Sequence, residues 1–289
     1  MPEVDEVIEA PFRHGDLDLS RRWRLGRSLR GRHYLEAIVL PNSLKSSLIP
    51  FFADIPLRVG YTGELRFGLL NILHRLDPRA LPLMAERYAQ LAEKPGDAVV
   101  RPLAKPRLTV DPANLLAAVS RQGLDRSRPV IVFCPGAEYG PAKRWPAAHF
   151  AALAQRLGAG GVQVWIIGSE SDAALGGQIA RDSEGAAVNL CGKTDLASAI
   201  DLMSVAEVVV SNDSGLMHVA AALDRPLVAL YGSSSPAHTP PLSDAARILR
   251  LEGLACSPCY KRECPLGHFR CMNELTPDRV ADEIASVRG

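Results

Sequence analysis

The stretch VVVSNDSGLMHVAAAL, residues 208–223, decides the fold class. It opens with three β-branched apolar residues, crosses a small polar loop at 211–215, and continues as a small-residue run typical of a helix. A strand without polar alternation is buried on both faces, which favours a parallel sheet covered by helices. Strands and helices are also expected to alternate before and after this stretch. Further strands are expected at 130–134, 162–167 and 226–231, and helices at 145–157, after Gly168 to Ile179, and from a Thr194 cap to 205.

The amino-terminal half is less regular, with strands expected at 36–40 and 57–61 and a helix at 81–91. A proline-rich segment at 94–112 is predicted to link two domains. A parallel α/β unit normally opens with a strand, a loop and a helix, yet this chain opens like the middle of a domain. We therefore expect an incomplete amino-terminal domain at 1–110, a carboxy-terminal domain at 111–275, and a last helix at 276–289 that packs back on the first domain.

Composition restricts the class of protein. The chain has 289 residues, 47% of them hydrophobic and 22% charged, which suits two folded domains. A net charge of +1 argues against a nucleic-acid binder. No apolar run reaches the ~20 residues of a membrane span, and the acidic start is unlike a secretory signal. A cytoplasmic location is predicted, with peripheral contact at a membrane left open.

Six arginines crowd one short stretch, at positions 21, 22, 24, 27, 30 and 32. Two interpretations are open for them. They could form the solvated face of a helix, or they could form a basic patch that binds lipid phosphates.

The loop PGAEYGPAKRWP, residues 135–146, follows an expected strand and precedes an expected helix. Free backbone N–H groups and the helix dipole favour an anion at such a position. Its small residues would let a diphosphate approach the backbone, and Lys143 would supply a positive charge. The glycine spacing and Lys-Ser/Thr pair of nucleotide hydrolases are absent. A surface loop with an ordinary exposed lysine is the alternative.

The loop SNDSG, residues 211–215, occupies the equivalent position after another strand. Asp213 could simply cap the following helix. Ser214 and His218 are four residues apart and therefore share a helix face, which would direct both side chains at one ligand. Ligands of parallel sheets bind beyond the carboxyl ends of the strands. Two anion-favouring helix starts at one sheet edge predict a nucleotide-diphosphate site.

Six stretches carry a family resemblance: 135–146, 212–223, RPLVALYG at 225–232, SP at 235–236, TPPL at 239–242, and LPNSLKS at 40–46. Through them, essentially the whole chain resembles the lipopolysaccharide heptosyltransferase II family, part of glycosyltransferase family 9. The resemblance implies an α/β fold of GT-B architecture, with two Rossmann-like parallel-sheet domains, of which the amino-terminal one is incomplete here.

The resemblance also implies the reaction. This would be the inverting, metal-independent transfer of L-glycero-D-manno-heptose from ADP-heptose to the first heptose of the lipopolysaccharide inner core. ADP-heptose would be the donor substrate, no cofactor would be required, and the acceptor would be the lipid A–core at the inner-membrane surface. Two alternatives are a related transferase with another sugar donor and a non-catalytic nucleotide-sugar-binding module.

By the same resemblance, Lys143 would offset charge on the departing ADP, and Lys45 and Arg66 would meet acidic groups of the acceptor. Lys45 could equally be a solvated loop lysine, and Arg66 could pair with Glu64. The implied donor-binding residues are Gly136, Lys143, Gly168, Ser169, Asp172, Asp213, Ser214, Gly215 and His218.

One feature of the family has no counterpart in this sequence. The family begins with a strand and a loop whose Asp is the expected general base, and no residue here matches it. General-base help is typically worth ~10²–10⁴ in rate. We therefore expect donor binding with slow or absent transfer, and a reading frame that extends upstream of Met1.

Two weaker patterns involve metal ligands. Asp16-Leu17-Asp18 matches the Asp-x-Asp metal motif of other transferases but is interpreted as a helix-capping turn. Near the carboxyl end, Lys261-Arg262 and His268 lie among four clustered cysteines, which could hold Zn²⁺ or an iron–sulfur cluster, form a disulfide, or remain free thiols. No metal is predicted for the reaction. The cysteines form a C-x₂-C-x₄-C-x₆-C pattern at Cys256, Cys259, Cys264 and Cys271.

Overall fold

The computed structural model describes residues 3–12 and 15–288, so Met1 lies outside the described residues. The chain divides into two compact α/β units. Among the described residues, the first comprises Glu3–Phe12, Gly15–Ala104 and Ala237–Thr239, and the second comprises Lys105–Pro236 and Pro240–Arg288. The chain passes between them inside the proline-rich segment at 94–112, which adds no helix or strand of its own before Pro112.

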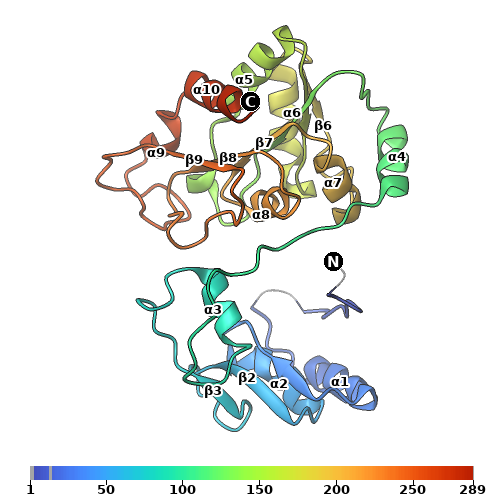
Figure 1. Cartoon of the computed structure of the whole chain (residues 1–289), viewed down its shortest axis with the longest axis vertical. Helices are drawn as coiled ribbons and strands as arrows, with labels where there is room; N and C mark the ends of the chain where they lie inside the picture. The colour runs from blue at the N-terminus through green and yellow to red at the C-terminus, as the bar shows by residue number, and fades with distance from the viewer. Residues whose placement is uncertain (1–2, 13–14, 289) are drawn as a thin grey trace. The chain divides into compact units, whose positions relative to one another are not determined.

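The second unit is built on a six-stranded sheet in which all neighbouring strands are parallel (Figure 1). The order is β6-β5-β4-β7-β8-β9. Numbered within this unit, it is 3-2-1-4-5-6, the order of dinucleotide-binding Rossmann domains. The strands are β4 (Val130–Cys134), β5 (Gln163–Ile166), β6 (Ala187–Asn189), β7 (Val208–Asn212), β8 (Leu227–Tyr231) and β9 (Ala246–Arg250).

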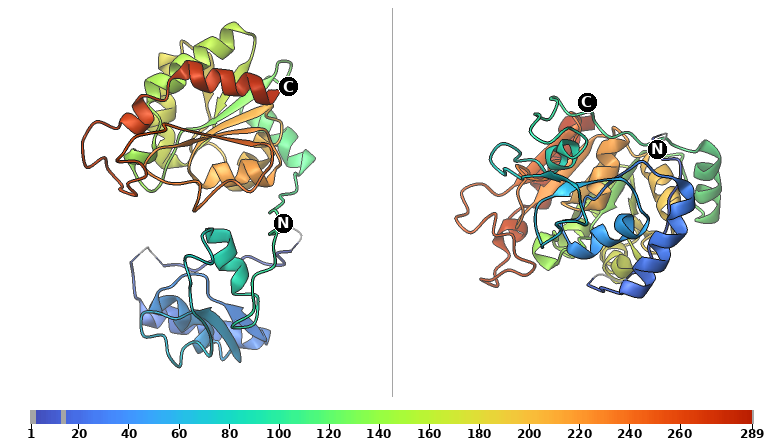
Figure 2. Two further views of the ribbon diagram at one scale, coloured as in Figure 1. Left: turned by 60° about the vertical axis from the view of Figure 1, so that its left-hand side comes forward. Right: turned by 90° about the horizontal axis from the view of Figure 1, so that it is seen from below.

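Helices cover both faces of this sheet, as the continuous apolar strands predicted (Figure 2). Along β4, Ile131 and Phe133 pack under α5, α6 and α10, whereas Val130 and Val132 pack under α4, α7 and α8. The alternation follows from the two-residue period of a strand. The bounds are α4 (Pro112–Arg121), α5 (Ala147–Ala159), α6 (Ala173–Asp182), α7 (Leu196–Met203), α8 (Gly215–Ala222), α9 (Arg270–Asn273) and α10 (Pro277–Arg288), with 3₁₀ turns η2 (Pro141–Lys143) and η3 (Glu170–Asp172).

The last helix, α10, uses its apolar face within the second unit. Val280, Ala281 and Ile284 are buried in the same core cluster as the strands and α5. From the sequence we expected this helix to pack on the first domain, but the strands and α5 of the second unit bury its apolar face. The difference arises because the helix period shows that a face is buried and not which surface buries it.

The first unit contains a three-stranded parallel sheet in the order β1-β2-β3. Helices α1 and α2 pack closely at Gly26, where a Cβ atom would lie 2.5 Å from the Cβ of Phe52. Asp18 caps α1 by accepting the Arg21 N–H at 3.1 Å, which confirms the capping turn expected at Asp16–Asp18. The bounds are α1 (Leu19–Leu29), η1 (Arg30–Arg32), β1 (Glu36–Ile38), α2 (Leu44–Phe52), β2 (Leu57–Tyr61), β3 (Ile72–His74) and α3 (Met84–Gln90).

Two local expectations need correction or completion. The residue that caps α7 is Asp195, whose carboxylate accepts the Ser198 N–H at 2.7 Å, rather than Thr194. The short strand β6 and the partly exposed strand β9 were not foreseen, because neither carries a long apolar run. Among the described residues, no helix combines the length and apolarity needed to span a bilayer.

Candidate functional site

The site lies where the strand order of the second unit reverses. Strands β4 and β7 are adjacent and parallel there, with Cys134 opposite Ser211 in the register. Each strand runs into one of the two loops singled out in the sequence, at 135–146 and 211–215. Parallel sheets of this order bind ligands at such a switch point. The fold therefore brings both predicted anion-favouring loops to one sheet edge.

Asn212 fixes both ends of the Lys143 loop to β7. Its side chain is fully buried, donates to the Pro135 carbonyl at 2.7 Å and accepts the Trp145 N–H at 3.1 Å. Trp145 is also fully buried, and its indole N–H donates to the Leu275 carbonyl at 2.7 Å. Buried polar groups are costly unless paired, so these bonds hold the loop in one position.

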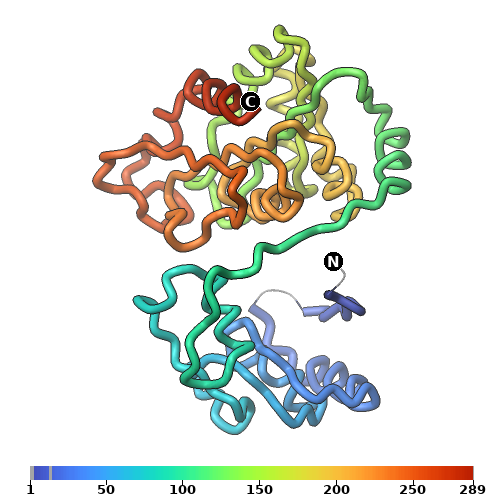
Figure 3. The backbone as a smooth tube through the Cα atoms, viewed as in Figure 1, coloured from blue at the N-terminus to red at the C-terminus, as the bar shows by residue number. Residues whose placement is uncertain are grey.

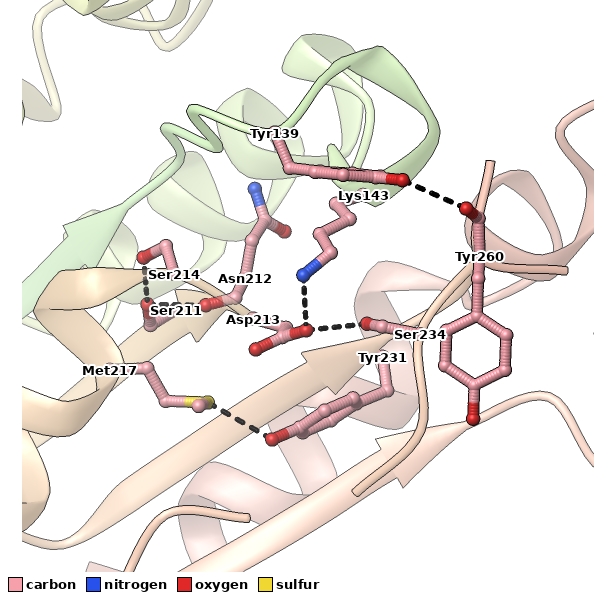
Figure 4. A network of polar contacts seen from close by, with 10 residues as sticks. All are labelled: Tyr139, Lys143, Ser211, Asn212, Asp213, Ser214, Met217, Tyr231, Ser234 and Tyr260. Carbon is pink, nitrogen blue, oxygen red and sulfur yellow. Dashed lines mark hydrogen bonds and ion pairs between the residues drawn. The ribbon is translucent and has the colours of Figure 1, made fainter. Parts of the chain in front are cut away.

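Lys143 and Asp213 form an ion pair at the centre of the site, with Nζ 2.6 Å from Oδ2 (Figure 4). Only 19% of the lysine side chain and 5% of the aspartate side chain are exposed. Ser234, which follows β8, donates its hydroxyl to the same Asp213 oxygen at 2.5 Å. The Lys143 ammonium also lies 5.3 Å from the centre of the Tyr139 ring. Asp213 thus orients the lysine. The simpler interpretation, that Asp213 caps α8, is not what the structure shows.

The start of α8 is available to an anion. Its N-cap, Ser214, has extended backbone angles and makes no side-chain capping bond. The next residue, Gly215, is exposed, and a Cβ atom there would meet nothing within 4 Å. The N-terminal N–H groups of a helix carry its positive dipole end. This position can therefore accept a phosphate next to the Lys143–Asp213 pair.

His218 lies one turn further along α8, in register with Ser214. Partial burial lowers the pKa of its imidazole; Asp213 opposes the shift and Lys143 reinforces it. The ring nevertheless remains accessible to solvent. His218 is therefore neutral near pH 7, and one ring nitrogen can accept a hydrogen bond while the other donates one.

A pocket of about 530 Å³ opens beside the α8 start. Two glycines in its wall allow close approach: a Cβ at Gly136 would lie 2.5 Å from Asp172 Oδ2, and one at Gly168 would lie 3.0 Å from Asp172 Cβ. Asp172 is held in place because it accepts the Ser169 N–H at 3.0 Å and the Ser169 hydroxyl at 2.7 Å. The lining comprises Gly136, Ala137, Glu138, Ile167, Gly168, Ser169, Asp172, Thr194, Asp195, Leu196, Ala199, Ser214, Gly215, Leu216 and Val219.

The structure thus groups all nine predicted donor residues, six of them in the pocket wall and three, Lys143, Asp213 and His218, around the ion pair. The pocket wall formed by 194–199 was not predicted from the sequence, because that segment follows the unrecognised strand β6. Nor were Asn212 and Ser234 predicted. Ser234 follows the end of an expected strand, which is the signal that could have identified it.

The two predicted acceptor residues differ in accessibility within the first unit. Arg66 is 1% exposed, and its guanidinium donates to the Tyr61 carbonyl and, at 2.9 Å, to the Pro41 carbonyl. Burial lowers the pKa of this guanidinium, and the nearby Glu64 opposes the shift. A cation enclosed in this way fixes the backbone and does not present itself to an acceptor. Lys45 is only partly buried, in the first turn of α2.

Two parallel-sheet units, one with a Rossmann strand order and a cationic switch-point site, define a glycosyltransferase of GT-B architecture. Residues 22–270 match the sequence profile of glycosyltransferase family 9 (heptosyltransferase). The chain belongs to this family.

Individual relatives agree with the family assignment. The chain is 49% identical to lipopolysaccharide heptosyltransferase 2 of Salmonella typhimurium, over 99% of this chain and 85% of that protein. It is 46% identical to lipooligosaccharide heptosyltransferase 2 of Haemophilus influenzae, over 98% and 85%. The solved structure of E. coli ADP-heptose lps heptosyltransferase II matches with a TM-score of 0.83 and 44% identity, over 92% of this chain and 80% of that one. These similarities support an enzyme of lipopolysaccharide core biosynthesis that transfers heptose.

Proposed function

We propose that this chain transfers L-glycero-D-manno-heptose from ADP-heptose to the first heptose of the lipopolysaccharide inner core. The observation that carries the proposal is the Lys143–Asp213 pair beside the uncapped start of α8, at the switch point of the second unit. A diphosphate is the group that a fixed ammonium and a helix N-terminus bind together. The sugar and the acceptor class in this proposal come from the names of the relatives, which specify ADP-heptose and lipopolysaccharide.

In the proposed donor complex, adenosine occupies the 530 Å³ pocket between Gly168 and the 194–199 segment. The diphosphate lies against Gly215, where no atom occupies the space of a Cβ, and against Lys143. His218, being neutral, hydrogen-bonds the donor without adding charge. Asp213 holds the ammonium in place, so little reorganisation is needed when the diphosphate arrives.

The proposed chemistry is a direct displacement at the anomeric carbon, which inverts its configuration. Negative charge grows on the departing ADP, and Lys143 together with the α8 dipole would stabilise it. These groups supply the role that a divalent cation has in metal-dependent transferases. We expect turnover to be unchanged when Mg²⁺ or Mn²⁺ is added, and an absolute requirement for either ion would refute this part of the mechanism.

We propose that Lys45 binds the acceptor and that Arg66 does not, because backbone carbonyls enclose Arg66. The first backbone N–H of α2, that of Leu44, donates to Glu64 Oε2 at 2.7 Å. The Lys45 ammonium, on the next residue, is the group of this turn that we propose for an acceptor phosphate. Lys45→Ala should raise the KM for the acceptor and leave that for ADP-heptose unchanged.

The reaction itself is tested by incubating the protein with ADP-heptose and a core lipid that ends at the first heptose. Mass spectrometry of the lipid should show an added heptose, and NMR of the product should show inversion at the anomeric carbon. Because no residue of the sequence matches the family's general-base Asp, we expect this product to form slowly. ADP-heptose binding without any product would favour the alternative, a nucleotide-sugar-binding module. Turnover with a different nucleotide sugar in preference would indicate a related transferase.

We further propose that α1 contacts the anionic membrane that holds the acceptor. The helix contains no acidic residue, and its outward face carries exposed Arg24 and Arg27, with the Arg27 guanidinium 5.3 Å from the Trp23 ring. Arginine beside an exposed tryptophan suits a lipid–water interface. Not all six arginines share this role, since Arg22 is buried and bonded to the carbonyls of Lys45 and Leu17.

Tryptophan fluorescence tests this contact selectively, because Trp23 is 48% exposed whereas Trp145 and Trp165 are fully buried. Vesicles containing phosphatidylglycerol should shift the emission to the blue and protect Trp23 from acrylamide. Phosphatidylcholine vesicles should not. Substituting Arg24 and Arg27 by Glu should abolish the shift, and an unchanged spectrum with anionic vesicles would refute the proposal.

A further inference from the structure

The loop between β9 and α9, residues 251–269, contains neither helix nor strand and leaves the sheet as a long excursion (Figure 3). It carries three of the four clustered cysteines, and the fourth lies in α9. All four are free thiols. Together with His268 they line one small cavity of about 20 Å³. Four thiols on one cavity are a feature that heptose transfer does not explain.

Hydrogen-bond donors already lie near two of these sulfur atoms. The Phe269 N–H donates to Cys264 Sγ at 3.4 Å. His268 Nδ1 accepts the Arg270 N–H at 3.0 Å, so the imidazole proton is on Nε2, which lies 4.0 Å from Cys256 Sγ. Donors of this kind stabilise thiolates and orient the ligands of bound metals.

We propose that Cys256, Cys259, Cys264 and Cys271 bind one thiolate-preferring divalent ion, Zn²⁺ or Fe²⁺. Both ions accept four thiolates in a tetrahedral arrangement, and the C-x₂-C pair has the usual spacing of a ligand knuckle. A cavity of about 20 Å³ suits a single ion better than an iron–sulfur cluster. Within the described residues no three ligand groups already stand at ion-binding spacing, so binding would require side-chain rotation toward the cavity.

The ion would have a structural role next to the transfer site. The Tyr139 hydroxyl donates to the Tyr260 carbonyl at 2.9 Å, and the Ala142 N–H donates to the Arg262 carbonyl at 3.0 Å. At Gly140 a Cβ atom would lie 2.5 Å from that same Arg262 oxygen. The cysteine loop therefore supports the loop that carries Lys143, and fixing the thiols on an ion would stiffen both.

Elemental analysis of protein purified without a histidine tag tests the site, independently of the proposed function. We expect about one equivalent of zinc or iron per chain, and the analysis itself identifies which. The double variant C256S/C259S should lose the metal, whereas C134A, which alters a buried strand cysteine, should keep it. Wild-type protein without either metal, and unable to bind Co²⁺ with a thiolate charge-transfer band after chelation, would overturn the proposal.

Thiol counting distinguishes metal binding from disulfides without relying on any variant. The chain has six cysteines, four of them in this cluster. Protein denatured with a chelator and without reductant should yield six reactive thiols if the cluster holds a metal. Two thiols would mean that the four cysteines are paired as disulfides, which would contradict the proposal. Native protein should release four reactive thiols only after chelation, because Cys134 and Cys191 are buried.

Discussion

Lys143→Met removes the ammonium of the central ion pair while keeping most of the side-chain volume. The Asp213 carboxylate, 5% exposed, would then retain the Ser234 hydroxyl as its partner. Breaking a fully buried pair costs about 3–5 kcal/mol, and an exposed pair contributes about 0–1 kcal/mol. Because Lys143 is 19% exposed and Ser234 remains, we expect a loss of about 1–3 kcal/mol in the free energy of unfolding.

A matched control exists in the same unit, since Lys105 pairs with Asp244 where the side chains are 49% and 93% exposed. Lys105→Met should cost about 0.5 kcal/mol or less. Both variants are best unfolded with urea in a Trp23→Phe background, so that fluorescence reports only Trp145 and Trp165 of the second unit. Equal costs for the two variants would refute the claim that the Lys143–Asp213 pair is buried.

The same variant should lose transferase activity by more than its stability explains. Removing one group that stabilises transition-state charge typically lowers kcat by about 10²–10³. Lys143→Arg keeps the charge and should retain more activity than Lys143→Met. If a folded Lys143→Met protein keeps the wild-type kcat, the proposed stabilisation of the departing ADP is wrong.

Three further predictions follow from single contacts. Gly136→Ala places a methyl group about 2.5 Å from the fixed Asp172 carboxylate in the pocket wall, so the wall must shift. The Kd for ADP should therefore rise by about tenfold. An unchanged Kd in calorimetry would contradict the role of the pocket. Asn212→Leu leaves two buried backbone groups unpaired and should cost about 2–4 kcal/mol in urea unfolding; a neutral result would show that the Lys143 loop is held otherwise. Burial lowers the pKa of His149 in the folded protein. As pH falls below ~6.5, the unfolded chain therefore takes up a proton before the folded chain does. The free energy of unfolding should then drop by at most about 1.4 kcal/mol per pH unit, until the pH reaches the lowered pKa of the folded state. His149→Phe should flatten that dependence, and an identical pH profile in urea unfolding would refute it.

The sequence predicted the second unit well because its strands are continuously apolar. The segments at 130–134 and 208–210 are apolar on both faces, which suits the middle of a parallel sheet. Glycine and small polar residues after each strand then indicated which loops to propose for a ligand. This reasoning depends only on local pattern, and it led to Lys143 and Asp213 on the same edge.

Long-range pairing accounts for what the sequence did not reveal. Whether Asp213 caps α8 or binds Lys143 depends on a contact 70 residues away. Arg66 was expected to meet acidic groups of the acceptor, yet carbonyls at Pro41 and Tyr61 enclose it. Strand β6 has three residues, which is too few for periodicity to distinguish from a loop. In each case the deciding partner is distant in the chain.

The central claim is that a nucleotide diphosphate binds at the start of α8 beside Lys143. A crystal structure of the protein with ADP tests it most directly. We predict phosphate oxygens within hydrogen-bond distance of the Gly215 N–H and Lys143 Nζ, with the adenine in the pocket lined by Gly168 and 194–199. Well-defined ADP bound elsewhere, with the Lys143–Asp213 pair untouched, would contradict the account.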